Sequence, residues 1–327
     1  MRLRVPVTIL SGALLAVACS DSSRSVTQPE APSFLDVAGA GGSHIHIMPT
    51  KAVANGLNDA RPGGGGHKQN TGIFYHGGPI IASTNVAAIY WGTSRIYNGG
   101  PTPGQTGTAN DNSLIAFFIN HEGGSPYFNI NTTYFDGAGT HVANVVTYAQ
   151  MWADNSNPGS APSDAAIQAE VSAGLSSGKL TYDASTLYAV FTGSGVNLGG
   201  GFGSQYCAYH GHFSWNGNDV KYAAQPYNYD FPSGCTEQGA NTPNGDPAAD
   251  AEVNTLAHEL EETTTDPDLN AWYDHRGQEN ADKCAWTFGT TYPAGSGVAN
   301  MNLGGKDFLI QRNWVNAGSG GCAVGYP

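Results

Sequence analysis

The sequence predicts a single layered domain of the α/β or α+β class, with a mixed sheet, several helices and long glycine-rich loops. Two observations lead to this prediction. Apolar runs of strand composition alternate along the chain with stretches of helical spacing, the order expected of layered proteins that combine helices and strands. Glycine occurs 45 times and gathers with asparagine and serine between these stretches, which indicates long surface loops.

The expected elements follow one another from residue 85 onward. Buried strands are predicted at 85–91, 141–148 and 186–192, with a fourth candidate at 221–227. Helices are predicted at 111–121 and at 163–175, the second capped by Ser163. The residues from 73 to the end have a globular composition, and this length is sufficient for one sizeable core.

A third helix is predicted between Asp246 and Asp266. Asp246 is a suitable N-cap and Pro247 suits the first helical position. The pair Asp266-Pro267 ends the helix, because the residue before proline disfavours helical dihedral angles. One apolar stripe of this helix is expected to face a core, formed by Val253, Leu256, Leu260 and Thr264.

This helix carries the sequence H-E-x-x-E, which predicts a metal site. His258 and Glu262 are four residues apart and therefore project from the same face. Glu259 has the position of the general base in a H-E-x-x-H zinc helix. Glutamate replaces the second histidine here, and carboxylate is itself a zinc ligand.

The charge pattern around the helix also favours a bound cation. No lysine or arginine occurs between Lys221 and Arg276, where eleven acidic residues lie: Asp230, Glu237, Asp246, Asp250, Glu252, Glu259, Glu261, Glu262, Asp266, Asp268 and Asp274. Negative charge at a helix C-terminus is unfavourable, and like charges three or four residues apart repel. A divalent ion would relieve both costs. The alternative is a solvated acidic face.

Further candidate ligands and catalytic groups lie after the helix and around His210 and His212. Asp268 or Asp274 is the expected third ligand, and a harder, oxygen-rich ligand set would favour calcium or manganese over zinc. The other third-ligand candidates are Asp266, His275, Glu279 and Asp282. His210, two residues before His212, or Tyr273 is a candidate for stabilising an oxyanion.

The N-terminal part of the chain predicts export. Residues 1–19 have the charged start and short apolar run of a signal peptide, and Cys19 ends a lipobox-like sequence, so that either lipid anchoring or plain secretion is expected. Residues 20–72 are rich in Ser, Pro, Gly and Ala and are predicted to be a flexible tether. His44 and His46 lie in this segment and are interpreted as incidental.

Composition limits the partners and predicts disulfides. The formal net charge of −13 argues against nucleic acid and against an anionic membrane as the main partner. Four cysteines remain after Cys19, and in an exported chain they predict two disulfides with three possible connectivities. We favour the local pairs Cys207–Cys235 and Cys284–Cys322.

Several short motifs in a consistent order resemble the phosphate-induced protein 1, or EXORDIUM-like, family of exported proteins. They are Y-H-G-G-P at 75–79, V-A-A-I-Y-W-G at 86–92, C-A-Y-H-G at 207–211, P-N-G-D at 243–246, N-T-L-A at 254–257, and Cys284 and Cys322. The resemblance covers roughly residues 73–325. It implies a bacterial branch with the H-E-x-x-E helix, followed by T-D-P at 265–267 and W-Y-D at 272–274.

The leading functional hypothesis is an exported zinc-dependent hydrolase, most simply a peptidase, with Glu259 as the general base. Its substrate would be a peptide or a cell-wall polymer. The alternative hypothesis is a non-enzymatic surface protein that binds wall carbohydrate or peptide through exposed aromatic residues. A third possibility is a scaffold stabilised by calcium.

Overall fold

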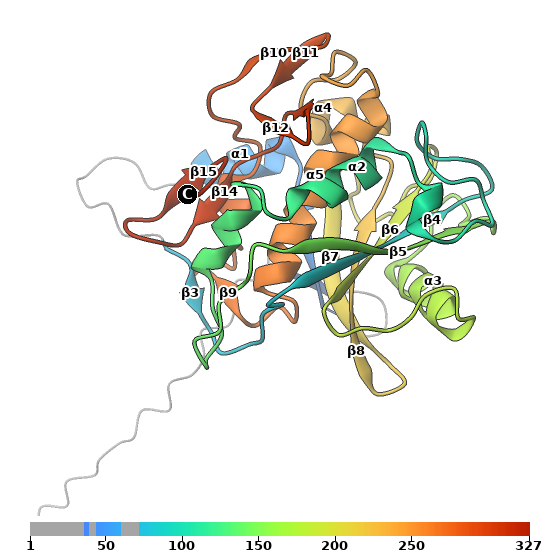
Figure 1. The fold of residues 1–327 in the computed structure, drawn as a ribbon, viewed down its shortest axis with the longest axis horizontal. Helices are drawn as coiled ribbons and strands as arrows, with labels where there is room; N and C mark the ends of the chain where they lie inside the picture. Colours follow the sequence, from blue (N-terminus) through green and yellow to red (C-terminus); the bar gives the residue numbers. More distant parts are fainter. Residues whose placement is uncertain (1–35, 39–43, 60–71) are drawn as a thin grey trace, which may run out of the picture. The chain divides into compact units, whose positions relative to one another are not determined.

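The computed structural model describes residues 36–38, 44–59 and 72–327, which belong to one compact unit (Figure 1). The expected signal peptide, Cys19 and much of the expected tether lie outside the described residues. No helix in the described part of the chain combines the length and the apolar composition that a membrane crossing requires.

A seven-stranded mixed sheet forms the centre of this unit, in the order β1-β2-β7-β8-β6-β4-β5. Its strands are β1 (Asp36–Ala38), β2 (His44–Pro49), β4 (Thr84–Trp91), β5 (Val146–Asp154), β6 (Thr186–Thr192), β7 (Tyr206–Trp215) and β8 (Asn218–Gln225). β4 pairs in parallel with β5 and β6, and β6 pairs in parallel with β8. β1, β2, β7 and β8 pair antiparallel. The predicted mixed sheet is therefore confirmed.

Helices cover both faces of the sheet. They are α1 (Lys51–Asp59), α2 (Leu114–Glu122), α3 (Asp164–Ser176), α4 (Pro232–Cys235) and α5 (Pro247–Thr265). Alternate residues of β4 show the two cores: Val86 packs in the core that contains α2 and α5, and Ala87 in the core that contains α3. β4 is thus buried on both sides, as expected of a parallel strand between helical layers.

Short elements complete the fold. The 3-10 helices are η1 (Thr108–Asn110), η2 (Phe128–Thr133), η3 (Asn228–Asp230) and η4 (Asp282–Cys284). Two-stranded sheets pair β3 (Phe74–Tyr75) with β9 (Trp272–Tyr273), β10 (Tyr292–Ala294) with β11 (Gly297–Ala299), β12 (Met301–Leu303) with β13 (Lys306–Phe308), and β14 (Asn313–Val315) with β15 (Gly321–Ala323). The predicted disulfides Cys207–Cys235 and Cys284–Cys322 are confirmed.

Several predicted boundaries agree with the structure and others shift. β6 spans the predicted residues, and Ser163 caps α3 as expected. α2 begins only at Leu114, because the Ser113 side chain accepts the Ala116 amide and so caps the helix there. The strand expected at 141–148 was placed too early. β5 begins at Val146, since the amide of Ala143 donates to Ala82 outside the strand.

The expected flexible tether is wrong for residues 44–59. This segment forms β2 and α1, and β2 joins the main sheet beside β7. Ile45 and Ile47 pack in the core on the α3 side, and Met48 is buried beside the Cys207–Cys235 disulfide. Burial of these apolar side chains stabilises the ordered strand.

α5 begins and ends as predicted, but its burial is more extensive. The Asp246 side chain caps it by accepting the Ala249 amide, and Asp266 follows its last residue. Burial extends around the whole helix after Pro247, rather than along one stripe. The reason is its position, since it packs on β7 and β8 and also contacts α2, η2 and η3 (Figure 1).

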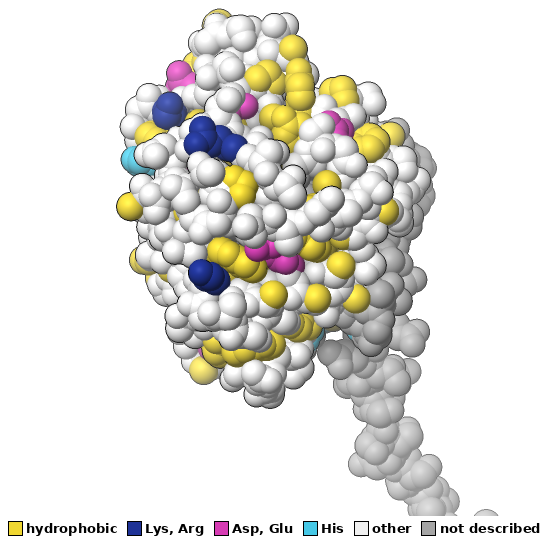
Figure 2. Space-filling model, turned by 90° about the vertical axis from the view of Figure 1, so that its right-hand side faces the viewer, with side chains coloured by type: hydrophobic (Ala, Val, Ile, Leu, Met, Phe, Trp, Pro, Cys, Tyr) yellow, Lys and Arg dark blue, Asp and Glu magenta, His cyan; other side chains and the backbone are white. Residues whose placement is uncertain are grey.

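Much of the acidity of the chain is internal. The face in Figure 2 shows mainly uncharged polar and hydrophobic side chains with scattered charged groups. The buried acidic residues are Asp111, Glu122, Glu170, Asp250, Glu252, Glu259, Glu261, Glu262, Asp266, Asp274, Glu279 and Asp282. Buried carboxylates require partners, and those around the C-terminal half of α5 lead to the candidate site.

Candidate metal centre

The pairing of β2 with β7 brings two histidines together. His46 and His210 are direct cross-strand partners in this antiparallel pair. Their side chains therefore leave the sheet on the same face, and their ring centroids lie 5.6 Å apart. That face is the one on which α5 packs.

α5 adds His258 and Glu262 to the same place. His258 Nε2 lies 3.1 Å from Glu262 Oε1, as expected for side chains one helical turn apart. Glu262 Oε2 lies 3.6 Å from His210 Nε2 and 4.0 Å from His46 Nε2. The side-chain amide of Gln311 contacts His258 Nδ1 and orients the ring.

The segment that leads into η4 supplies two carboxylates. Asp282 Oδ2 lies 2.7 Å from His46 Nε2, and Asp282 Oδ1 lies 3.5 Å from His258 Nε2. Glu279 Oε1 lies 3.5 Å from His46 Nδ1 and 3.6 Å from His210 Nε2. The Asp282 amide also donates to Glu262 Oε1 at 3.0 Å, which fixes the segment against α5.

These side chains form what we call the six-residue cluster: His46, His210, His258, Glu262, Glu279 and Asp282. All six residues are buried. The buried atoms without a hydrogen-bond partner include His210 Nδ1 and Nε2, His258 Nε2, Glu262 Oε2, Glu279 Oε2 and Asp282 Oδ1. An unpaired buried polar atom is costly, so this set points to a shared ligand.

The pKa shifts in the cluster have two physical causes, burial and the contact of imidazole with carboxylate. Burial alone would raise the pKa of Glu262, but His258 and His210 hold it well below its usual range. Burial alone would lower the pKa of His258, but Glu262 and Asp282 raise it to about 10. Burial dominates at His210 and lowers its pKa, which keeps this imidazole neutral.

The donor set fits a transition-metal ion. Three imidazoles and three carboxylates offer more nitrogen than calcium prefers, whereas imidazole with carboxylate is typical of zinc. A divalent cation would give the unpartnered atoms of the cluster a common ligand. It would also compensate the negative charge of Glu262, whose pKa is lowered in this structure by neighbouring imidazoles.

Glu259 lies beside the cluster and has the properties of a proton-transfer group rather than those of a ligand. It is fully buried, and both of its carboxylate oxygens lack a hydrogen-bond partner. Burial raises its pKa well above the usual value, although His258 and His46 act in the opposite direction. A buried carboxyl of raised pKa beside a metal site is suited to take up and release a proton.

Several of the site residues predicted from the sequence lie outside the six-residue cluster. Asp268 lies 3.1 Å from Lys221 Nζ, and Asp274 lies 2.8 Å from Lys283 Nζ. Each therefore has a lysine partner in place of His258. Tyr273 lies in β9, where its ring stacks on His76 at a centroid distance of 3.7 Å.

Two further third-ligand candidates also lie outside the six-residue cluster. His275 is exposed. Asp266 uses Oδ1 to accept the amides of Asn270 and Ala271, which orders the turn after α5. From the list of third-ligand candidates, the fold thus brings Asp282 to His258 and Glu262, and Glu279 to Glu262 and His210.

Sequence reasoning missed His46 as a site residue. The signal that could have revealed it is the alternation of histidine and isoleucine in H-I-H-I over residues 44–47, a pattern typical of a strand. The pairing with β7 depends on contacts between segments about 160 residues apart in the chain. No local pattern encodes it.

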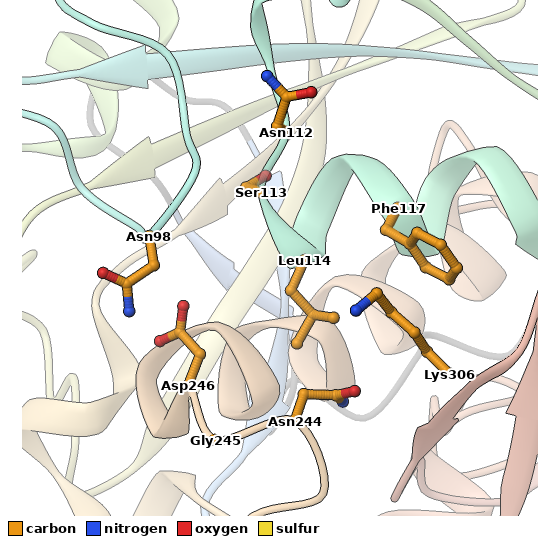
Figure 3. A pocket seen from close by; sticks show the side chains of 9 residues that line it. All are labelled: Asn98, Asn112, Ser113, Leu114, Phe117, Asn244, Gly245, Asp246 and Lys306. Carbon is orange, nitrogen blue, oxygen red and sulfur yellow. The ribbon is translucent and has the colours of Figure 1, made fainter.

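Two surface pockets lie away from the cluster. The first has a volume of about 270 Å³ and is lined by residues at the starts of α2 and α5, such as Leu114 and Asp246, and by Lys306 of β13 (Figure 3). Asp246 precedes His258 by twelve residues, which is about 18 Å along a helix. The second pocket, of the same volume, lies beside Trp91. Neither pocket is lined by a residue of the six-residue cluster.

Comparison with known proteins identifies relatives of the chain. The family model described as the phosphate-induced protein 1 conserved region matches residues 73–305. Protein EXORDIUM-like 5 of Arabidopsis thaliana is 25% identical over 284 residues, covering 73% of this chain and 74% of that protein. Protein EXORDIUM-like 3 of the same plant is 25% identical over 241 residues, covering 66% and 69%. Solved structures gave no significant match.

Proposed function

The chain belongs to the phosphate-induced protein 1 family, and from this premise we propose that it is an exported zinc-dependent hydrolase acting on a peptide or a cell-wall polymer. One observation carries the proposal. Buried nitrogen and oxygen atoms without hydrogen-bond partners converge around the H-E-x-x-E sequence of α5. Five residues of the six-residue cluster lie inside the family match, and His46 lies before it.

The residues of the cluster have distinct roles in this proposal. His258 and Glu262 hold the ion, with Asp282 as the third ligand in place of Asp268 or Asp274. A divalent ion bound there supplies the acidity that activates water and polarises a carbonyl. Glu259 takes the proton from the attacking water and delivers it to the leaving group, for which its unpartnered oxygens and raised pKa suit it.

Hydrolysis also requires an opening of the buried centre. β2 is well placed to provide it, because His46 lies at one side of the cluster in contact with Asp282 and Glu279. β2 also lies before the family match and near the edge of the sheet, where only β1 pairs beyond it. A strand in this position can separate from β7 without breaking the parallel part of the sheet.

The test is an assay of the zinc-loaded chain on peptide libraries and on isolated wall polymers, with products identified by mass spectrometry. We expect Glu259→Gln to retain zinc and to lose turnover by at least about a hundredfold, since it removes general-base catalysis. Asp268→Asn is the matched control and should keep full activity. Turnover by Glu259→Gln equal to that of the unmodified chain would contradict the role of Glu259.

A second candidate function is binding of wall carbohydrate, and an aromatic surface favours it. Phe135 is 37% exposed and contacts Tyr75 and Trp272, with ring centroids 6.4 and 5.0 Å away. Phe74, beside Tyr75, is 49% exposed. Exposed rings of this kind can stack on sugars. Sedimentation with insoluble wall polymer should then fall in a Phe74→Ala, Phe135→Ala variant and be insensitive to chelators.

Export is part of the proposal and has its own support. Both disulfides of the domain are formed, and disulfides persist in oxidising compartments. Whether Cys19 carries a lipid is decided by mass spectrometry of the mature N-terminus. A diacylglyceryl mass on Cys19 would establish the anchor, and an unmodified N-terminus after cleavage would establish secretion.

A further inference from the structure

We propose that the centre holds two divalent cations, of which zinc fits the donors best, bridged by the carboxylates of Glu262 and Asp282. This inference rests on the metal centre of the proposed function but is independent of hydrolysis. A one-metal H-E-x-x-E site would require only His258, Glu262 and a third ligand. The structure contains additional buried donors that such a site does not use.

Glu262 presents its two oxygens to different partners. Oε1 faces His258 Nε2 at 3.1 Å, and Oε2 faces His210 Nε2 at 3.6 Å. A carboxylate that binds one ion with each oxygen holds two metals at the separation of about 3.5–4 Å found in two-metal hydrolytic sites. Glu262 therefore has the disposition of a bridging ligand.

Asp282 repeats this division from the other side. Oδ1 lies 3.5 Å from His258 Nε2, and Oδ2 lies 2.7 Å from His46 Nε2. The two carboxylates thus separate the imidazoles in the same way, with His258 on one side and the β2–β7 histidines on the other. The proposal rests on this geometry, in which Glu262 and Asp282 each direct one oxygen to His258 and the other to a histidine of β2 or β7.

The donors divide between the two positions. At the first, Glu262 Oε1 and Asp282 Oδ1 lie 3.1 and 3.5 Å from His258 Nε2. The second position is built around His210, where Glu262 Oε2 and Glu279 Oε1 each lie 3.6 Å from His210 Nε2, with His46 next to them. Unpartnered buried atoms occur at both positions, namely His258 Nε2 and Asp282 Oδ1 at the first and His210 Nε2 and Glu262 Oε2 at the second.

The experiment is elemental analysis of the zinc-saturated chain after removal of free metal, together with anomalous diffraction at the zinc edge. We expect about two zinc ions per chain, as two peaks about 3.5–4 Å apart. His210→Ala should retain about half of this zinc and lose the peak at the second position. Glu279→Gln tests the same position with a smaller change, in case His210→Ala folds poorly.

His212→Ala is the matched control, because His212 lies two residues further along β7 and contacts Asp219 outside the cluster. It should retain both ions. A single zinc per chain, with one peak, would overturn the inference and leave the proposed hydrolase intact. A chain without zinc would overturn both, whereas two zinc ions without hydrolysis would support the inference and count against the proposed function.

Discussion

Two acidic clusters start from alternate residues of β7, His210 and His212, and differ in how their charge is compensated. The six-residue cluster receives His210. What we call the lysine cluster receives His212 and consists of His212, Asp219, Lys221 and Asp268. Both combine carboxylates with an imidazole, and both arrangements of side chains would accommodate a metal ion by distance alone.

The lysine cluster already contains a cation. Lys221 Nζ contacts Asp219 and lies 3.1 Å from Asp268 Oδ1, and His212 Nδ1 lies 2.8 Å from Asp219 Oδ1. Burial alone would lower the pKa of Lys221, but the two aspartates raise it, so the ammonium stays charged. The side chain of Asp219 is 40% exposed, and water therefore screens part of this charge.

Among the described residues, no lysine or arginine pairs with the six-residue cluster, and the side chains of the cluster are almost completely buried. Its electrostatic compensation comes from imidazoles, which carry at most a proton each. The comparison teaches that a count of carboxylates does not predict a metal. A metal is predicted where the carboxylates are buried and the described part of the chain brings no lysine or arginine to them.

Removal of metal should give the largest difference between the clusters. A ligand present at a thousand times its Kd stabilises a protein by about 4 kcal/mol. We expect the zinc-loaded chain to lose stability of this order in excess EDTA, which corresponds to a fall in Tm on the order of 10 °C for a domain of this size. Calorimetry measures it, and an equal Tm with and without EDTA would remove the basis of the comparison.

Matched histidine variants should separate the clusters next. His258→Ala removes a ligand and leaves Glu262 and Asp282 without their imidazole, for which we expect a loss of zinc and about 3 kcal/mol of stability. His212→Ala should keep the zinc and cost at most about 1 kcal/mol, since its contact is partly exposed. Urea unfolding with zinc analysis measures both. Equal losses in the two variants would show that the clusters do not differ.

The sequence predicted the parts of this comparison that depend on local pattern. The bounds of α5 follow from Asp246, Pro247 and Asp266-Pro267, and the structure confirms them. The spacing of His258 and Glu262 on one face is likewise a property of a single helix. The mixed sheet and the two local disulfide pairs were also predicted correctly.

The remainder depends on contacts between distant segments. His46 reaches the cluster through the pairing of β2 with β7, and the amide of Asp282 donates to Glu262 on the distant α5. Asp268 was an expected third ligand, yet Lys221 on β8 lies 3.1 Å from it. The sequence showed the candidates, and the tertiary fold determines which of them meet.

Acidification should release zinc well before it protonates Asp219 of the lysine cluster. Metal binding requires neutral imidazole, so protons compete with the ion at His258 below its pKa of about 10, and more strongly as the pH falls. We expect zinc release between about pH 6 and pH 5. Dialysis of the zinc-loaded chain at stepwise lower pH, with zinc measured in the dialysate, tests this. Zinc retained at pH 4 would mean that the bound ion is held by carboxylates and not by imidazoles.

Protonation of Asp219 in the lysine cluster should have the smallest effect and should occur at lower pH. Lys221 and His212 hold the pKa of Asp219 below its ordinary value, although burial alone would raise it. A carboxyl group whose folded pKa is lowered stabilises the fold above its unfolded pKa, near 4, and this contribution is lost as the pH falls through the folded pKa. Because Asp219 is partly exposed, we expect this contribution to the free energy of unfolding to be at most about 1 kcal/mol.

Lys221→Met in the metal-free chain should abolish this part of the stability change between about pH 4 and pH 2 and leave the zinc content at pH 7 unchanged. If Lys221→Met instead increased the zinc content, the ammonium would be shown to exclude a metal from a site that is otherwise able to bind one.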